Sequence, residues 1–265
     1  MTPLKRVEFN VTELCNRKCY FCPRAHGYPN KNLHMSVDVA KEAVKQTSLY
    51  TDWISLSGRG EPLLCNNFLD ILEICRKQKV RFNTNGDKLT DSLLKEIDKI
   101  IDLNTRYGKR EKVMVDSYDS LEQHNDRKKR WGHYKAIWFD YKPDKKIKSI
   151  DQLKKLMNGK VNNRGGSLPF TSHEWISKPC YYLYFKTMID WNGDVNLCCH
   201  NWEDIKVFGN IIDTSFVDIW EGDEMNEWRQ GLTKGRTFKQ CMECDNMLNY
   251  EESKKTYELF QSKKN

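Results

Sequence analysis

The sequence predicts an α/β fold: a parallel sheet that forms a whole or partial barrel, followed by a small cysteine-rich unit. Two observations support it. Strand-like and helix-like segments alternate from residue 5 to residue 117, and glycines or polar residues follow the strand-like segments. Alternating strands and helices form βαβ units with parallel strands. Ligand-binding residues at strand ends are typical of barrels.

Length and composition set the outer limits. A chain of 265 residues can bury one core with a small appended module. Its ten cysteines favour metal ligation over disulfides, because Met1–Arg6 lacks the apolar part of a secretory signal. No apolar run reaches the roughly 18 residues of a membrane span, so we expect a cytoplasmic protein. The net charge of +7 favours anionic partners without choosing among them.

Local signals predict the individual elements. Hydrophobic alternation marks the strands, and Ser36 is a typical first residue of a helix. In chain order, the predicted strands cover residues 5–13, 53–57, 80–86 and 113–117, and the predicted helices begin at Ser36 and cover residues 68–77 and 89–101.

Three cysteines follow the first strand with the spacing C-x3-C-x2-C: Cys15, Cys19 and Cys22. A loop this short can direct three sulfurs to one point, but it offers no fourth. Structural zinc sites and most iron–sulfur clusters have four protein ligands. The pattern therefore indicates a four-iron cluster with one iron open to a small molecule. The alternative is three free cysteines in a surface loop.

This loop, with Phe21 before its last cysteine, resembles the radical S-adenosylmethionine (SAM) superfamily. The resemblance implies a partial (β/α)6 TIM-like barrel over residues 1–170, in which the three cysteines hold a SAM-binding 4Fe-4S cluster. The strand ends agree with it in their order. The resemblance implies that SAM is contacted by Phe21, by Gly58, Gly60 and Glu61 after the second strand, by Asn85 after the third, and by Ser117, which pairs with Asp119, after the fourth.

A second set of thiols, Cys180, Cys198, Cys241 and Cys244, has the spacing C-x17-C, a long gap, and C-x2-C. A hairpin predicted at residues 190–195 brings the first two together. Four thiolates can hold zinc or a four-iron cluster. With residues 209–211 and 218–220, however, the region resembles the SPASM and twitch modules of the same superfamily.

No cysteine follows Cys244, so the resemblance implies the twitch form, with one auxiliary 4Fe-4S cluster. We expect this module over residues 171–250, and a helix or tail over 251–265. Cys65 and Cys75 are expected to be core thiols. Cys199 is expected to be a small buried residue, with exchange for Cys198 as an alternative.

Basic and aromatic residues are concentrated from 122 to 155. Such a mixture can bind nucleic acid through phosphate contacts and base stacking. No nucleic-acid motif accompanies it, so we favour a solvated insertion with inward-facing aromatic side chains.

Arg164 lies in a turn with Gly165 and Gly166. From about Val7 to Asp245 the chain resembles twitch-type dehydrogenases that oxidise an aminocyclitol. Their arginine in this turn contacts the substrate hydroxyl, which makes Arg164 the candidate catalytic residue; an ordinary surface arginine is the alternative. A guanidinium stays protonated, so we expect it to position and polarise the substrate oxygen.

The resemblance implies reductive cleavage of SAM and hydrogen abstraction from a substrate C–H bond. The expected outcome is the two-electron oxidation of an alcohol on a sugar-like or cyclitol substrate, with the auxiliary cluster as electron acceptor. The expected partners are that substrate and a flavodoxin- or ferredoxin-type donor. Two alternatives stay open: a peptide-modifying maturase, against which the short segment before the first strand argues, and an RNA-directed protein that uses residues 122–155.

Overall fold

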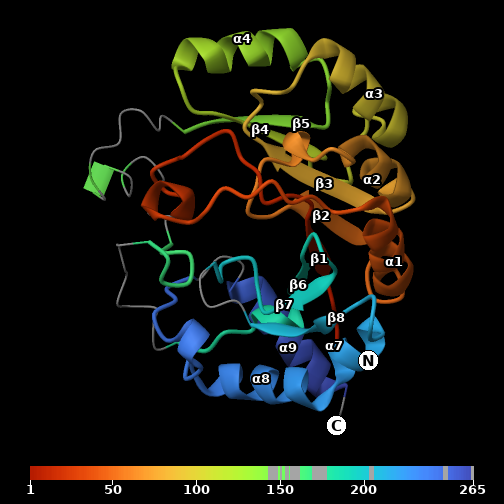
Figure 1. Ribbon diagram of the computed structural model, residues 1–265, viewed down its shortest axis with the longest axis vertical. Coiled ribbons are helices and arrows are strands. Elements are labelled where there is room, and N and C mark those ends of the chain that lie inside the picture. Colours follow the sequence, from red (N-terminus) through yellow and green to blue (C-terminus); the bar gives the residue numbers. More distant parts are fainter. Residues whose placement is uncertain are drawn as a thin grey trace.

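The computed structural model describes residues 1–142, 149, 151–152, 155, 162–168, 178–202, 206–246 and 250–263. Within them an eight-stranded sheet has the order β5-β4-β3-β2-β1-β6-β7-β8 (Figure 1). The strands are β1 (Arg6–Asn10), β2 (Trp53–Ser57), β3 (Lys79–Thr84), β4 (Val113–Ser117), β5 (Ile137–Tyr141), β6 (Lys186–Ile189), β7 (Asp194–Asn196) and β8 (Val207–Asn210).

The strands β1 to β5 are parallel, and each lies beside its predecessor in the sequence. β6 pairs in parallel with β1, whereas β7 and β8 continue the sheet antiparallel. The α/β fold and the partial barrel are therefore confirmed. The sixth parallel strand, β6, covers the free edge of β1. It also comes from residues 186–189, within the segment assigned to the C-terminal module.

Four helices connect the parallel strands and cover one face of the sheet (Figure 1). Three of them begin at side-chain caps, in which the hydroxyl of Ser36, Thr90 or Ser120 accepts a backbone N–H bond three residues later. The helix start predicted at Ser36 is thus confirmed. The helices are α1 (Val37–Thr47), α2 (Phe68–Cys75), α3 (Asp91–Ile101) and α4 (Leu121–Trp131).

The two faces of the sheet differ sharply. On β1, Val7 and Phe9 are fully buried in the core beneath the helices. Because side chains alternate along a strand, Glu8 and Asn10 point to the opposite, concave face. The core also contains Cys65 and Cys75, which confirms them as core thiols.

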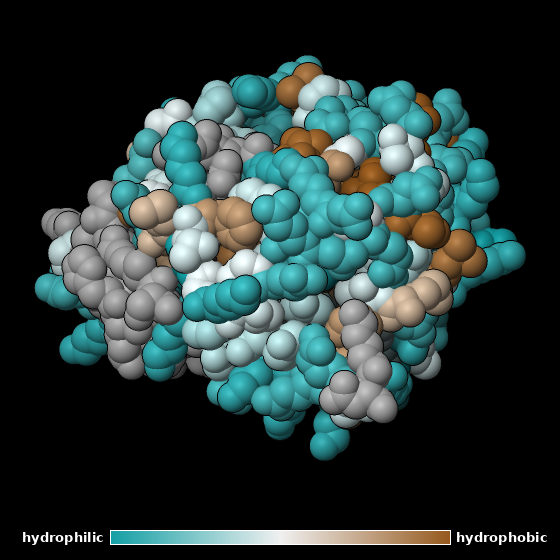
Figure 2. Space-filling view, turned by 90° about the horizontal axis from the view of Figure 1, so that it is seen from below, coloured by the Kyte–Doolittle hydropathy of each residue, from teal (hydrophilic) through white to brown (hydrophobic). Residues whose placement is uncertain are grey.

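After β8 the chain forms α7 (Phe216–Glu221), α8 (Asp223–Lys234) and α9 (Tyr250–Ser262). The hairpin predicted at residues 190–195 joins β6 to β7, and α9 is the expected C-terminal helix. None of the helices in the described ranges is long and apolar enough to cross a membrane. The face in Figure 2 is mostly hydrophilic, with most of its hydrophobic residues toward the upper right and a smaller group left of the centre.

The basic and aromatic stretch is part of the barrel, because it contains α4 and β5. Trp131 is buried, and Arg127 pairs with Asp87 at 3.0 Å. Arg130 pairs with Asp91 at 2.5 Å on the surface, and Trp138 is 51% exposed. Two of the cationic side chains that could contact phosphate, Arg127 and Arg130, are therefore already paired with carboxylates of the protein. Residues 143–148, 150 and 153–154 of this stretch lie outside the described residues.

Candidate active site and metal centres

A cavity of about 240 Å³ opens at the carboxyl ends of the parallel strands. We call it the larger cavity. Its position follows from the topology, because the ends of parallel strands meet at one edge of a sheet. Strands and loops far apart in the sequence line it: Glu8, Cys15, Arg17, Cys19, Phe21, Cys22, Ser57, Gly58, Arg59, Gly60, Glu61, Asn83, Thr84, Asn85, Asp116, Tyr118, Arg164, Cys199 and Trp202.

The structure brings the first three predicted cysteines to this cavity. Asn30 fixes the start of their loop, since its side chain accepts from Cys15 N at 2.9 Å and donates to Cys15 O at 3.0 Å. The buried Arg24 donates to Glu13 O at 2.6 Å and fastens the loop to the end of β1. Burial raises the pKa of the Cys15 thiol and therefore favours its neutral form. A nearby positive charge or metal would be needed to favour the thiolate, which is the form that binds metal.

The turn after β2 needs glycine at two positions. A Cβ at Gly58, where φ is +136°, would lie 2.2 Å from Asn10 Oδ1. One at Gly60 would lie 2.3 Å from Thr12 O. The turn is therefore packed directly against the loop after β1. Both glycines also line the larger cavity, as predicted.

Glu61 lies in the same turn with both carboxylate oxygens bound. Its Oε1 accepts from the Thr84 hydroxyl at 2.6 Å, and its Oε2 accepts from Asn85 N at 2.7 Å. Burial nevertheless raises the pKa of Glu61 to about 7, since desolvation outweighs these hydrogen bonds. The carboxyl group therefore changes charge near neutral pH.

The two residues predicted to contact SAM after β3 and β4, Asn85 and Ser117, differ in whether they line the larger cavity. Asn85 lines the cavity and donates to Asn16 Oδ1 at 2.8 Å. Ser117 is absent from the described lining: it is fully buried, and its Oγ lies 3.4 Å from Arg127 Nη1. Its neighbours Asp116 and Tyr118 face the cavity instead. The physical reason is alternation, because a shift of one residue turns a strand side chain to the other face.

The arginine between the two glycines forms a buried ionic network. Arg59 Nη1 donates to both carboxylate oxygens of Asp190 at 2.8 Å and lies 3.3 Å from Glu13 Oε1. Its Nη2 donates to Asn201 O at 3.3 Å. Arg59 thus connects the glycine turn to the loop after β1, to the end of β6 and to the segment after Cys198. Its sequence position gave no signal of this role.

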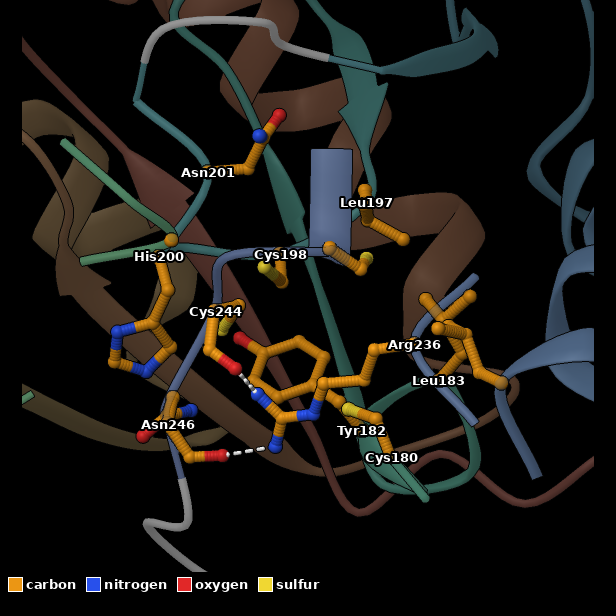
Figure 3. A pocket seen from close by; sticks show the side chains of 13 residues that line it. Cys180, Tyr182, Leu183, Leu197, Cys198, His200, Asn201, Arg236, Cys244 and Asn246 are labelled. Atoms are coloured by element: carbon orange, nitrogen blue, oxygen red, sulfur yellow. Dashed lines mark hydrogen bonds between the residues drawn. The ribbon is translucent and has the colours of Figure 1, made fainter. Parts of the chain in front are cut away.

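A smaller cavity of about 30 Å³ lies in the C-terminal part, and all four predicted cysteines line it (Figure 3). Burial raises the pKa of Cys198, and the neighbouring thiols raise it further. Burial likewise raises the pKa of Cys244 to about 11. These buried thiols would ionise together only around a cationic group that offsets the repulsion between their charges. Arg236 orders the C-x2-C loop by donating to the carbonyls of Cys244 and, at 2.6 Å, Asn246.

One segment, Cys198–Trp202, separates the two cavities, and we call it the wall segment. Cys198 lines the smaller cavity, whereas Cys199 lines the larger one. Cys199, expected to be a small buried hydrophobic residue, is partly buried and packs against the hydrophobic core, but its thiol also has polar neighbours. Its Sγ is 3.2 Å from the hydroxyl of Tyr182 and 3.7 Å from Lys186 Nζ.

The loop with Arg164 also contacts both cavities. Arg164 lines the larger cavity and Gly165 the smaller. Arg164 has a φ of +51°, which is unusual for a residue with a side chain. Its N–H donates to Asn162 Oδ1 at 3.1 Å. Beside it, Asn163 is fully buried, and its N–H donates to Asp245 Oδ1 at 2.7 Å. This hydrogen bond ties the loop to the segment after Cys244.

Sequence reasoning missed several residues of the larger cavity. Glu8, Asp116 and Trp202 line it without a recognised motif. A signal existed for Glu8. A carboxylate that alternates with valine and phenylalanine in a central strand is unusual, because such strands are normally apolar on both faces.

Comparison with known proteins identifies the family. A model of the radical SAM superfamily matches residues 9–171. The chain belongs to this superfamily. A second model, SPASM, described as an iron-sulfur cluster-binding domain, matches residues 180–245.

Two curated proteins are similar to this radical SAM chain. It is 26% identical to the S-adenosyl-L-methionine-dependent 2-deoxy-scyllo-inosamine dehydrogenase of Niallia circulans, over 96% of this chain and 97% of that enzyme. It is 29% identical to the S-adenosylmethionine-dependent nucleotide dehydratase of Lacinutrix mariniflava, over 48% of this chain but only 26% of that protein.

Solved structures share the fold. BtrN in complex with AdoMet and 2-DOIA matches with a TM-score of 0.72 and 21% identity, over 92% of this chain and 94% of that one. Streptococcus suis SuiB bound to the precursor peptide SuiA matches with a TM-score of 0.51 and 13% identity, over 92% and 70%.

The cofactors of a radical SAM protein with a cluster-binding domain are SAM and iron–sulfur clusters, and the residues present suit them. Three thiols in one short loop line a cavity large enough to admit a further ligand. Four thiols surround a separate, smaller cavity. In the number and kind of their donor atoms these sets correspond to iron–sulfur sites with and without an open iron. Among the described residues, no three metal-ligating side chains are already grouped closely enough to hold a metal ion.

The Arg59 network yields a stability prediction. Replacing Arg59 with methionine leaves Asp190, whose side chain is 10% exposed, as a buried carboxylate without its cation, and leaves Glu13 with Arg24 as its remaining cation at 3.6 Å. We expect the free energy of unfolding, measured by urea denaturation, to fall by about 3–5 kcal/mol. The control is Arg76→Met, whose ion pair with Glu73 is exposed, and it should change by less than about 1 kcal/mol. Equal effects of the two substitutions would contradict the network's importance.

Proposed function

We propose that the protein is a radical SAM dehydrogenase that oxidises an alcohol on a small sugar-like or cyclitol substrate. The observation that carries the proposal is the wall segment, where consecutive cysteines line two different thiol-lined cavities. A substrate in the larger cavity would lie on one side of that segment, and an electron acceptor on the other. The similarity to the Niallia circulans dehydrogenase over nearly the whole of both chains supports the same reaction class.

In this proposal Cys15, Cys19 and Cys22 hold the cluster that SAM completes, and Cys180, Cys198, Cys241 and Cys244 hold the auxiliary cluster. When bound, these groups supply the radical that abstracts hydrogen and the acceptor for one electron. The protein orients the cofactor. Gly58, Gly60 and Glu61 suit the amino group of SAM, with Phe21 and Asn85 beside the nucleoside. The contact predicted for Ser117 passes to Asp116 or Tyr118, which face the cavity.

Arg164 is the proposed substrate-positioning group at the reacting end. Among the described residues no carboxylate pairs with its guanidinium, which leaves its donors available to a substrate oxygen. A guanidinium cannot accept the hydroxyl proton at ordinary pH. Its contribution is therefore to hold the hydroxyl and to polarise its oxygen in the larger cavity.

The partners we propose are a small polar substrate and a flavodoxin- or ferredoxin-type electron donor. A peptide-modifying maturase is less well supported, because the whole-length relative is named for a small-molecule reaction. A function in RNA binding is also less well supported, because Arg127 and Arg130 form ion pairs within the protein.

Metal content tests the two-cluster assignment. After anaerobic reconstitution we expect about eight irons per chain, and about four in a Cys15/Cys19/Cys22→Ala triple variant. With reductant and SAM, the wild type should convert 2-deoxy-scyllo-inosamine, our first probe, to a ketone together with 5′-deoxyadenosine, and the variant should form neither. Zinc in the C-terminal site would remove the electron acceptor and with it the proposed oxidation.

Substitution of Arg164 tests its role. We expect Arg164→Ala to lower kcat/KM for the alcohol substrate roughly 100-fold, the size of effect seen when one positioned hydrogen-bond donor is removed from an active site. The kcat/KM of Arg164→Lys should lie between those of the wild type and Arg164→Ala, because lysine keeps the positive charge but lacks the planar guanidinium that can donate two parallel hydrogen bonds. The control is Arg130→Ala, on an exposed ion pair. Unchanged kcat/KM in Arg164→Ala would assign this residue to the surface of the loop.

The raised pKa of Glu61 leads to a prediction of how the affinity for SAM depends on pH. Since its pKa is raised to about 7 by burial, it is neutral below that pH and a poor acceptor for the SAM ammonium group. Affinity measured by calorimetry should therefore rise with pH by up to about tenfold per unit and level off above pH 7. Glu61→Gln should bind more weakly and without this slope. A slope that persists in the variant would belong to another group.

A further inference from the structure

Two arginines lie on the concave face of the sheet, next to residues that line the larger cavity. Arg6 lies two residues before Glu8 on β1, and Arg81 lies two residues before Asn83 on β3. Side chains two residues apart point to the same face of a strand, and Glu8 and Asn83 both line the cavity. Each arginine therefore shares the face of a cavity residue, one step closer to the start of its strand.

The strand between the two arginines places a hydroxyl between them. β2 lies between β1 and β3 (Figure 1), and its Ser55 pairs in register with Glu8 on one side and with Arg81 on the other. Its neighbours Ile54 and Leu56 face the core, so Ser55 faces the concave side. Neighbouring strands are roughly 4.8 Å apart, so the long side chains of both arginines can reach one ligand above Ser55.

The protein satisfies these two guanidinium groups poorly. The Nε of Arg6 is buried and has no hydrogen-bond partner among the described residues. The Nη2 of Arg81 lies 2.6 Å from Met114 Sδ and 3.4 Å from Asn83 Oδ1, and both of these acceptors are uncharged. In the part of the chain that the structure describes, neither arginine forms an ion pair. Because polar groups at buried positions are normally paired, the arrangement indicates an anion that the chain does not supply.

The carboxylates whose charges act on Arg81 are engaged with other cations. Glu8 lies 3.5 Å from Lys186 Nζ. Glu111 lies 3.7 Å from a nitrogen of Arg106. On this part of the concave face one carboxylate, Glu8, therefore stands beside three cationic side chains, and positive charge is left over.

The two guanidinium groups also repel each other. Burial lowers the pKa of Arg81, and the positive charge of Arg6 lowers it further. Both residues are half-buried, so part of each stays open to a ligand. An anion bound between them would remove the repulsion and supply acceptors for their N–H groups.

We propose that the larger cavity takes a phosphorylated substrate, whose sugar or cyclitol ring lies in the cavity and whose phosphate binds between Arg6 and Arg81. The inference rests on the proposed function for the reaction at the ring, and it deepens that function by naming the substrate class. A phosphate monoester carries nearly two charges at pH 7 and has three free oxygens. These can accept from both guanidinium groups and from the Ser55 hydroxyl, whereas a carboxylate has one charge and two oxygens.

Calorimetry on the reconstituted protein tests the proposal, with SAM present and reductant left out so that no turnover occurs. The probes are inorganic phosphate, myo-inositol 1-phosphate, myo-inositol, and quinate as a cyclitol carboxylate. We expect myo-inositol 1-phosphate to bind at least about tenfold more tightly than myo-inositol or quinate. Arg6→Gln and Arg81→Gln should each weaken its binding roughly tenfold, and the double variant roughly 100-fold, because each removes hydrogen bonds to a charged group. Inorganic phosphate should follow the same order.

The matched control is Arg130→Gln, which removes the same charge from an exposed ion pair with Asp91. It should leave the affinity for myo-inositol 1-phosphate unchanged. Urea denaturation checks that each variant is folded. Arg6→Gln, at the first residue of its strand, carries the comparison if Arg81→Gln does not fold.

The outcomes separate the inference from the proposed function. Equal affinity of the wild type and both arginine variants for myo-inositol 1-phosphate would overturn the phosphate site and leave the dehydrogenase standing. Quinate that binds as tightly as myo-inositol 1-phosphate would overturn the choice of phosphate. Zinc in the C-terminal site would instead overturn the proposed oxidation, while phosphate binding that depends on the two arginines would still support the site, because the measurement needs no turnover.

Discussion

The buried ion pair between Arg59 and Asp190 fixes the positions of the two proposed metal centres relative to each other. Taking these charges out of water costs several kcal/mol each, which only very good geometry offsets. That geometry is present: both carboxylate oxygens of Asp190 are 2.8 Å from Arg59 Nη1. Asn10 and Asn196 also donate to Asp190, at 2.5 and 2.6 Å. The turn proposed to bind SAM and the segment after Cys198 therefore depend on one guanidinium.

Stability and function are divided between the two faces of the sheet. The helix-facing side is apolar and fully buried, and it carries the hydrophobic contribution to folding. The concave side carries Glu8, paired with Lys186 at 3.5 Å, together with Asn10 and Asp116. Polar groups in this position reduce the stability that the sheet could reach. They are retained where ligands must be held, as is usual at functional sites.

The sequence predicted those features that depend only on residues close together in the chain. The strand at 53–57, the helix start at Ser36 and both cysteine sets follow from periodicity, capping and spacing. Long-range pairing was not predictable. β6 has only four residues, and its place beside β1 depends on contacts made far along the chain. The orientation of Ser117, whose side chain is fully buried and outside the lining of the larger cavity, was not predictable for a related reason, because a motif gives the position of a strand end but not which face a side chain takes.

The place of β6 has a consequence for how the protein is made. Asn10 and Asp190, which meet at the ends of β1 and β6, are 180 residues apart in the sequence. During synthesis β1 can pair with β2 early, but its other edge must wait until almost three quarters of the chain has emerged. Such late, non-local pairing slows folding and leaves an open strand edge that can associate with other chains. The pairing of β1 with β6 therefore connects the two ends of the sheet and also determines the order in which the sheet can form during synthesis.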